Sequence, residues 1–355
     1  METLKSWIRQ HQLAAFFIIT FTISWGPGFS FYKVFQSGYE LLFPLAAIAI
    51  CSPALAGITV AKVSNKEPKG ETTQPFWIAF LIAMLFSTAV FLINNVVVNK
   101  ATFSPIMLLF TPIVISPVAY VFSSAFSRIP SVRHYLSSVY LVRRVGGWLL
   151  LAPVVMLGID LLSNWISNLL GRPTVILSNL PFNGFELVKM LVISFLYQLL
   201  FFNLSGEEIG WRGFALARLL GRTNPMIASL VLTFFWAIYH AFYWGALGDP
   251  VLTLQYWVDT WVRLFPATIV INWFYIHSKG SILVAGVTHA VANTFFTYLP
   301  GLDWPLHTAT LYGISLLVVL LELWWKKLPD ESPAVIQLDE NEIKGSNQPI
   351  RILGG

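Results

Sequence analysis

The chain has 355 residues, of which 22 are Lys or Arg and 17 are Asp or Glu. Charged residues make up 11% of the chain, against about 25% in an ordinary soluble domain, while 56% of the residues are hydrophobic. So few charges cannot cover a water-facing surface, which excludes soluble, fibrous and disordered proteins and predicts a membrane protein. The net charge of +5 is expected to report orientation in the bilayer and not contact with nucleic acid. The single Cys51 forms no internal disulfide and excludes a cysteine-rich metal site.

Ten stretches approach the length of about 20 apolar residues that a helix needs to cross the hydrocarbon core. They lie at 13–32, 41–61, 76–98, 103–124, 147–167, 187–220, 224–244, 259–277, 281–299 and 307–325. The first is too long for the apolar region of a signal peptide, so we expect it to be a span. The sequence therefore predicts an all-α fold, a polytopic membrane helix bundle with about ten transmembrane helices.

Lys and Arg are distributed unevenly between the two sides of this arrangement. Seventeen fall on the side of the termini and five on the other side, and cytoplasmic loops are the ones enriched in these residues. We therefore expect a multi-pass protein of the cell membrane, surrounded by membrane lipids, with both termini in the cytoplasm. Residues 328–355 have little apolar periodicity and are expected to form a disordered cytoplasmic tail.

Ionisable side chains inside the predicted spans gather in one third of the chain. Such groups are costly in a membrane unless they are paired or hydrated, so each one indicates a functional site. In the first five spans the clearest case is Asp160, which either pairs with a polar neighbour inside the bundle or marks a second functional site. The sixth, seventh and ninth spans hold the polar residues Glu207, Glu208, Arg212, His240, His289 and Asn293.

Two adjacent glutamates in the sixth span are expected to have different environments. Glu208 and Arg212 are four residues apart, on one helix face and in the favourable order for an ion pair. Glu207 points about 100° away around the helix and has no local partner, which leaves it available as a general base. The alternative is that all three charges lie at a hydrated helix end.

A histidine in the seventh span is expected at the same depth as the unpaired glutamate. The turn residues around Thr223 separate the two spans, with Glu207 16 residues before Thr223 and His240 17 residues after it. In an antiparallel helical hairpin that rises about 1.5 Å per residue, both side chains would lie about 25 Å from the turn. The two groups are therefore predicted to meet inside the membrane.

The ninth span adds His289 and Asn293, which share a helix face at positions i and i+4. Their depth would allow them to meet the hairpin that carries Glu207 and His240. A glutamate with two histidines can hold a zinc ion or activate water directly, and an asparagine amide suits a developing oxyanion. Hydrolysis of an acyl bond inside the bilayer is the leading hypothesis from these residues.

Three ordered motifs resemble those of the CPBP intramembrane protease family: Glu207-Glu208-x-x-x-Arg212, an aromatic residue four before His240, and His289-x-x-x-Asn293. That family includes the Ras-converting CAAX prenyl endopeptidases, bacteriocin-processing and immunity proteins, and proteins similar to lysostaphin resistance protein A. The resemblance covers about 187–300. It implies a protease domain at 187–300, and it does not extend to the N-terminal transmembrane helices expected at 1–186, the last transmembrane helix expected at 301–327 or the tail at 328–355.

The resemblance implies catalytic roles for four residues. It makes Glu207 the base that activates water, with His240 assisting it or binding a metal. His289 and Asn293 would stabilise the oxyanion. If zinc is bound, its ligands would be His240, His289 and Glu207; family members are described both as metalloproteases and as glutamate proteases that need no catalytic metal, and both versions stay open here.

The same resemblance implies supporting roles. Glu208 and Arg212 would brace the site. Trp236 would form a wall for the substrate, because it stands where the family usually has Phe, whereas Phe235 is displaced by one position. This departure concerns the fit of the substrate more than the chemistry.

The predicted function is therefore that of an intramembrane endopeptidase. It would hydrolyse a peptide bond of a membrane-associated peptide or protein, including a prenylated CAAX-like one, through a Glu-activated water. One alternative is a secondary transporter with a five-plus-five repeat, although the charged residues come mostly from one segment. Another is a catalytically silent immunity or scaffold protein. The polar residues Asn272, His277, His307 and His134 are expected at hydrated span ends or in loops.

Overall fold

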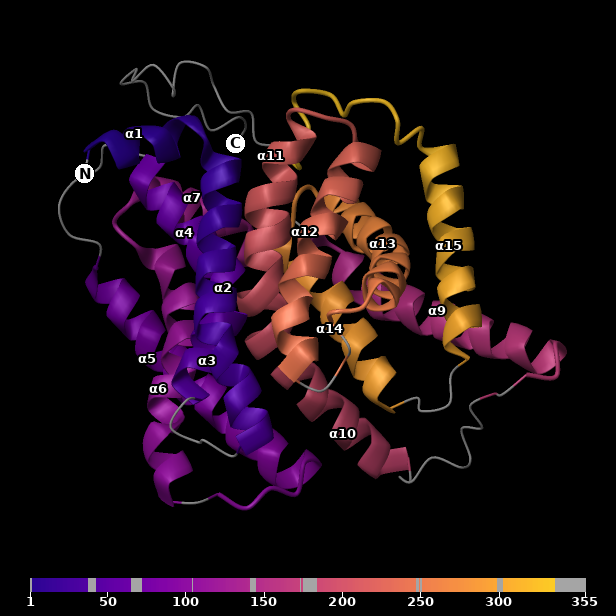
Figure 1. Ribbon diagram of the computed structural model, residues 1–355, viewed down its shortest axis with the longest axis horizontal. Coiled ribbons are helices and arrows are strands. Elements are labelled where there is room, and N and C mark those ends of the chain that lie inside the picture. Colours follow the sequence, from indigo (N-terminus) through magenta and orange to yellow (C-terminus); the bar gives the residue numbers. More distant parts are fainter. Residues whose placement is uncertain are drawn as a thin grey trace.

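The computed structural model (Figure 1) describes residues 2–37, 43–64, 72–103, 105–140, 145–172, 174, 184–246, 249, 251–298 and 303–335. Within these ranges every regular element is a helix. The predicted all-α, polytopic membrane bundle is therefore confirmed. Of the predicted tail, 336–355 lie outside the described residues.

Each of the ten predicted spans contains helix. The elements are α2 (Gln12–Ser37), α3 (Phe43–Ile50), α4 (Ser52–Ser64), α5 (Gln74–Ile93), η2 (Asn94–Val98), α6 (Pro105–Ser123), η3 (Ser124–Phe126), α9 (Trp148–Leu169), α10 (Gly184–Tyr197), η5 (Gln198–Glu208), η6 (Trp211–Leu216), α11 (Ala217–Leu220), α12 (Pro225–Ala246), α13 (Leu254–His277), α14 (Ile282–Tyr298) and α15 (Trp304–Leu321). The stretch from α10 to α11 is the long sixth span.

We predicted about ten membrane spans, and fewer described helices are both long enough and apolar enough to cross a membrane. Six described helices are long and apolar enough, and a seventh span results if α3 and α4, bent by 67°, are one broken span. The others are α2 and α14, whose apolar parts are the shorter Gln12–Pro27 and Ile282–Phe295, and α13, which carries Asp259 and Arg263.

Two short helices lie outside the predicted spans, α1 (Glu2–Gln10) and α7 (Pro130–Tyr140). In α7 the residues Val132, Tyr135, Leu136 and Val139 are buried, which is the spacing of one apolar helix face. Tyr135 donates a hydrogen bond from its hydroxyl to the carbonyl of Ile209, inside the sixth span. Both helices lie at the same end of the molecule as α11 (Figure 1). They cover one end of the bundle and do not cross it.

The main core surrounds the segment that follows the two glutamates. Trp211 and Phe214 of η6 are fully buried and pack against Phe16 of α2. At Gly210 an added Cβ would lie 2.4 Å from the backbone of Pro53, so only glycine permits this approach of α4. This contact fixes the helix turn that presents Glu207 and Glu208.

The π-helical segments η5 and η6 were not predicted. A π-helix has hydrogen bonds from i to i+5, is rare, and is found mainly at functional sites. Here it includes both glutamates and Arg212.

The chain after α15 folds back onto the bundle. The backbone N–H of Met226 bonds to the carbonyl of Trp324, and Asn224 donates from its side chain to the carbonyl of Trp325. Ala334 is fully buried in the main core. Within 328–335, which we expected to belong to a disordered tail, Leu328, Ala334 and Val335 therefore pack on the main core near the α11–α12 turn.

Candidate active site

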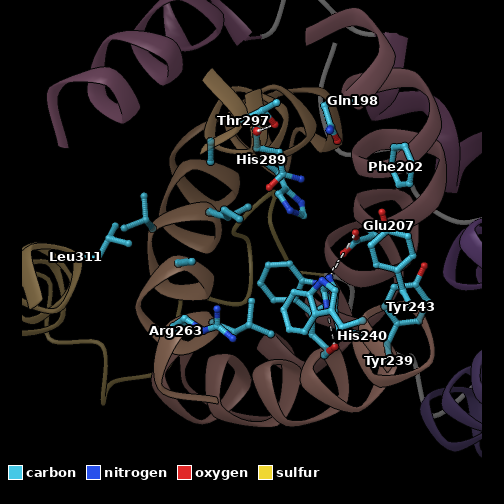
Figure 2. A pocket seen from close by; sticks show the side chains of 18 of the residues that line it. Gln198, Phe202, Glu207, Tyr239, His240, Tyr243, Arg263, His289, Thr297 and Leu311 are labelled. Atoms are coloured by element: carbon cyan, nitrogen blue, oxygen red, sulfur yellow. Dashed lines mark hydrogen bonds and ion pairs between the residues drawn. The ribbon is translucent and has the colours of Figure 1, made fainter. Parts of the chain in front are cut away.

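A cavity of about 530 Å³ lies between η5, α12, α13 and α14, with α9 and α15 adding to its wall. Glu207, His240, His289 and Asn293 all line it. Figure 2 shows the first three around one space, on three different helices. The structure thus brings the four predicted catalytic residues together in one cavity.

Glu207 is 6% exposed, and its two carboxylate oxygens have different neighbours. Oε2 accepts a hydrogen bond from the indole Nε1 of Trp236. Oε1 lies 3.9 Å from Nε2 of His240. One oxygen is therefore held in place, while the other faces an imidazole across a gap in the cavity.

The tautomer of His240 follows from its hydrogen bond. Its Nδ1 lies 2.9 Å from the carbonyl oxygen of Trp236, and a carbonyl only accepts, so Nδ1 carries the hydrogen. In the neutral ring, Nε2 then presents a lone pair toward the Glu207 carboxylate, which is also an acceptor. Trp244 stacks on the imidazole with ring centroids 4.4 Å apart and fixes its plane. Two facing acceptors call for a ligand with two donor hydrogens, such as water.

Glu208 lies in a network of buried hydrogen bonds. Its Oε1 accepts from Arg212 Nη1 at 2.7 Å and from His289 Nδ1 at 2.7 Å. Arg212 Nε donates to Asn272 Oδ1 at 3.0 Å, and Asn272 Nδ2 donates to Ser229 Oγ at 2.9 Å. The side chains of Glu208 and Arg212 have no solvent exposure. The structure therefore contains the ion pair predicted from the i, i+4 spacing, at a buried position and not at a hydrated helix end.

Two atoms of this network have no protein partner within the described part of the chain. They are Glu208 Oε2 and Arg212 Nη2. The Arg212 guanidinium lies over the Trp236 ring, 4.8 Å from its centroid, and the ring of His289 meets the same indole edge-on at 5.2 Å. Such cation–π contact compensates part of the lost hydration of a buried cation.

Trp236 lines the cavity, as expected for a substrate wall, but it has further contacts. Its indole N–H holds Glu207, and its ring packs against Arg212 and His289. Phe, which the family usually has at this position, has no N–H and could not hold the carboxylate. The unusual residue therefore positions the site's charged groups.

His289 and Asn293 lie one turn apart on α14 and both line the cavity. Since Glu208 accepts the His289 Nδ1 hydrogen, the other ring nitrogen, Nε2, is left for the cavity. The Asn293 side-chain amide has no hydrogen bond to any residue that the structure describes. It is available to a ligand.

Two residues that we expected at hydrated span ends instead have polar partners inside the bundle. Asn272 has no solvent exposure and connects Arg212 to Ser229. His307 Nε2 lies 2.9 Å from Asp160 Oδ1, and both residues line the same cavity as Glu207. Helical spacing is the sequence signal that could have placed His307 at the cavity. Trp304, His307, Thr308 and Leu311 form one face of α15 toward it.

The other two polar residues set aside lie as expected. His277 is part-buried at the end of α13, where its Nε2 is 3.2 Å from Glu322, and His134 is exposed on α7. Neither lines the cavity.

The predicted zinc ligands are not arranged as a metal site. Among the described residues, no three His, Cys, Asp or Glu side chains are grouped closely enough to hold a metal ion. Glu207 and His240 face each other, but His289 is turned onto Glu208. A catalytic zinc usually has three protein ligands, so this donor set does not fit one in its present geometry.

The fold and the cavity define a class of protein, a helical membrane bundle with a buried carboxylate, two imidazoles and an amide around an internal cavity. Comparison with known proteins narrows this class. Residues 188–295 match the family described as type II CAAX prenyl endopeptidase, Rce1-like. This match over 188–295 confirms the resemblance that the three motifs indicate.

One curated relative is CAAX prenyl protease 2 from Methanococcus maripaludis. It is 27% identical over 92 residues, which are 24% of this chain and 34% of the relative. The chain thus matches about a third of that relative's length. The matched family segment includes all seven predicted site residues but neither Asp160 nor His307.

Proposed function

We propose that this chain is an intramembrane endopeptidase that hydrolyses a peptide bond of a membrane-associated substrate. The observation that carries the proposal is the Glu207 carboxylate, which faces His240 Nε2 across 3.9 Å inside the cavity. The adjacent Glu208 carboxylate is paired with the Arg212 cation, so of the two glutamates Glu207 is the one available as a base.

In the proposed reaction, water donates one hydrogen bond to Glu207 Oε1 and one to His240 Nε2. Its oxygen lone pair then points away from both acceptors, toward the substrate carbonyl. As the new C–O bond forms, Glu207 takes a proton from the water, and that proton passes to the leaving nitrogen when the C–N bond breaks. General-base catalysis of this kind contributes about 10² to 10⁴ in rate.

The oxyanion that develops on the carbonyl needs donors on the opposite side of the cavity. The Asn293 amide supplies an N–H, and His289 supplies Nε2–H when its ring is protonated. Glu208 accepts the Nδ1–H of the same ring and fixes the orientation of the imidazole. Glu208 and Arg212 thus act through His289, and Trp236 acts by holding Glu207.

We further propose that Glu207 activates water without a metal ligand. Support comes from the donor set, in which two acceptors and not three face a common point. Exhaustive chelation of the purified protein should leave turnover unchanged, with no stoichiometric zinc by elemental analysis. Loss of turnover on chelation, with recovery on adding zinc, would show that a metal is needed.

The substrate and the orientation belong to the same proposal. Six described helices are long and apolar enough to span a membrane, which supports a site surrounded by membrane lipids. The excess of Lys and Arg on the side of the termini supports cytoplasmic termini. The relative's printed name is that of a CAAX prenyl protease, so a prenylated CAAX-type peptide is one substrate to test.

The test is a cleavage assay in detergent with prenylated and unprenylated peptides, analysed by mass spectrometry. Wild-type protein should release two fragments from at least one peptide, and Glu207→Gln protein from none. Absence of cleavage of every peptide by folded wild-type protein would favour the silent scaffold instead.

A further inference from the structure

The residues that line the cavity lead from the glutamate toward one end of the bundle only. Gln198 lies nine residues before Glu207 (207 − 198), Asp249 nine after His240 (249 − 240), and Thr297 eight after His289 (297 − 289). Because the α10–α11 stretch is antiparallel to α12 and α14, all three steps point away from the α11–α12 turn.

The lining residues of α13 and α15 extend toward the same end of the bundle. In α15 the lining residues begin at Trp304 in the first turn, and in α13 they include Arg263 in the first half. Both helices begin at the end of the bundle that is opposite the turn, since the carbonyl of Trp325, beyond the end of α15, bonds to Asn224 in the turn. We call the end with Asp249, Thr297 and Trp304 the open end.

The opposite end is closed. Between Glu207 and the turn, Trp211, Arg212, Phe214 and Leu216 have no solvent exposure, and none of them lines the cavity. Helices α1 and α7 cover this end (Figure 1). We call it the sealed end.

The described basic residues are distributed unevenly between these two ends. Five lie at the open end: Lys33, Lys100, Arg172, Lys189 and Arg263. Arg212 lies within the bundle and is assigned to neither end. Ten lie at the sealed end: Lys5, Arg9, Lys62, Arg128, Arg133, Arg218, Arg222, Lys279, Lys326 and Lys327. Because cytoplasmic loops are the ones enriched in Lys and Arg, the sealed end is the cytoplasmic one.

We infer that the cavity opens on the extracytoplasmic side, and that its substrate is a membrane-anchored polypeptide segment presented from that side. This rests on the proposed function and narrows its substrate class. A prenylated tail on a cytoplasmic protein would meet the sealed end, where fully buried aromatic side chains separate it from Glu207. An exported peptide or an extracytoplasmic juxtamembrane segment meets the open end directly.

The residues at the open end suit such a segment. Asp249 and Arg263 are both exposed and carry opposite charges, so the mouth attracts polar backbone and side chains of either sign. Trp304 and Trp244 also line the cavity, and tryptophan is enriched at the membrane–water interface. The cavity volume of about 530 Å³ lies within the range of ligand pockets, about 300–1,000 Å³.

Cysteine labelling with a membrane-impermeant maleimide tests the side of the opening without any need for turnover. The native Cys51 is buried, so wild-type protein gives the background. Leu252→Cys, at a side chain that is 97% exposed in the α12–α13 connection, reports the open end, and Thr297→Cys reports the cavity mouth. Lys326→Cys, at an exposed residue beyond α15, is the matched control at the sealed end.

In intact cells, Leu252→Cys and Thr297→Cys protein should be labelled at least tenfold above wild type, and Lys326→Cys protein only after permeabilisation. The reverse pattern would overturn the inference. So would labelling of Leu252→Cys alone, because the cavity would then be closed at that end. Labelling as expected without cleavage of any peptide would support the inferred orientation and contradict the proposed function.

The substrate class is tested with a lipid-anchored peptide added outside sealed right-side-out vesicles. Wild-type protein should cleave it, and Glu207→Gln protein should not. If the peptide is cleaved only in inside-out vesicles, the substrate approaches from the cytoplasm and the inferred class is wrong.

Discussion

Two neighbouring carboxylates lie in two different regions of this molecule. Glu208 belongs to the sealed region, where it accepts hydrogen bonds from Arg212 and His289 at 2.7 Å each and has no solvent exposure. Glu207 belongs to the open region, where an indole N–H and a facing imidazole are its neighbours. The position of each glutamate around the helix therefore decides which one is neutralised by Arg212 and which one is available as a base.

The two environments have different energetic consequences. A buried ion pair contributes little net stability, because desolvation offsets the attraction, yet removing one partner is costly. A buried carboxylate without a cation is unfavourable for folding and persists when the surrounding structure holds it in place, as at many functional sites. We therefore expect substitutions in the sealed region to affect stability and those in the open region to affect turnover.

Glu208→Gln is expected to have the largest effect on stability. It leaves Arg212 buried without its counter-ion, which should lower the free energy of unfolding by about 3–5 kcal/mol. Thermal unfolding in detergent measures the loss. The double replacement Glu208→Leu with Arg212→Leu is the control, and it should be less destabilised than Glu208→Gln alone. An unaltered melting temperature for Glu208→Gln would mean that the pair is hydrated, and the contrast between the regions would disappear.

Asp160→Leu extends the comparison to the pair between α9 and α15. It leaves His307 without its acceptor and should lower the free energy of unfolding by about 1–3 kcal/mol. Asp160→Asn keeps an acceptor oxygen and is the matched control, with a smaller loss. If Asp160→Asn instead stops cleavage at unchanged melting temperature, the pair is a second catalytic site.

Trp236→Phe sharpens the account of the open region. The substitution keeps the aromatic wall but removes the N–H that holds Glu207, so kcat should fall about tenfold with little change in KM. Trp244→Phe is the matched control, since that ring stacks on His240 without bonding to Glu207. Equal kcat values for both variants and wild type would show that the indole N–H does not position the base.

The smallest effect is expected at the start of α15. The hydrogen bond from Arg172 holds the pKa of Asp303 below its ordinary value. The resulting stability is fully present above the ordinary pKa of Asp, about 4, and is lost as the pH falls through the lowered folded-state value.

Melting temperatures from neutral pH down to about pH 3 measure this loss. Asp303→Asn should flatten the low-pH part of the curve while keeping the N-cap of α15, because Asn caps as well as Asp. An identical slope in wild type and variant would assign the acid sensitivity to other carboxylates.

The grouping of the candidate catalytic residues could be predicted from their spacing along the helices. Counting from Thr223 places Glu207 and His240 at one depth, and the i, i+4 rule pairs Glu208 with Arg212. Asn272 escaped this reasoning, because it lies 60 residues from the Arg212 side chain that it binds. A neutral side chain within a long apolar helix has no local partner in the sequence that would reveal such a contact.

The positions of the helices could also be predicted, since long apolar runs indicate them directly. The π-helical geometry could not, because it accompanies a tertiary contact, the approach of Pro53 to Gly210. The short helices α1 and α7 were missed for a different reason. They lie along one end of the bundle, so no apolar run of membrane-spanning length marks them.

The division of labour between the two carboxylates is tested most directly by the cleavage rate and the melting temperature of Glu207→Gln protein, measured beside Glu208→Gln protein. Gln keeps the volume of Glu but cannot take a proton from water. The account predicts that Glu207→Gln lowers the cleavage rate at least about a hundredfold at an unchanged melting temperature. Near wild-type turnover of Glu207→Gln protein would contradict it.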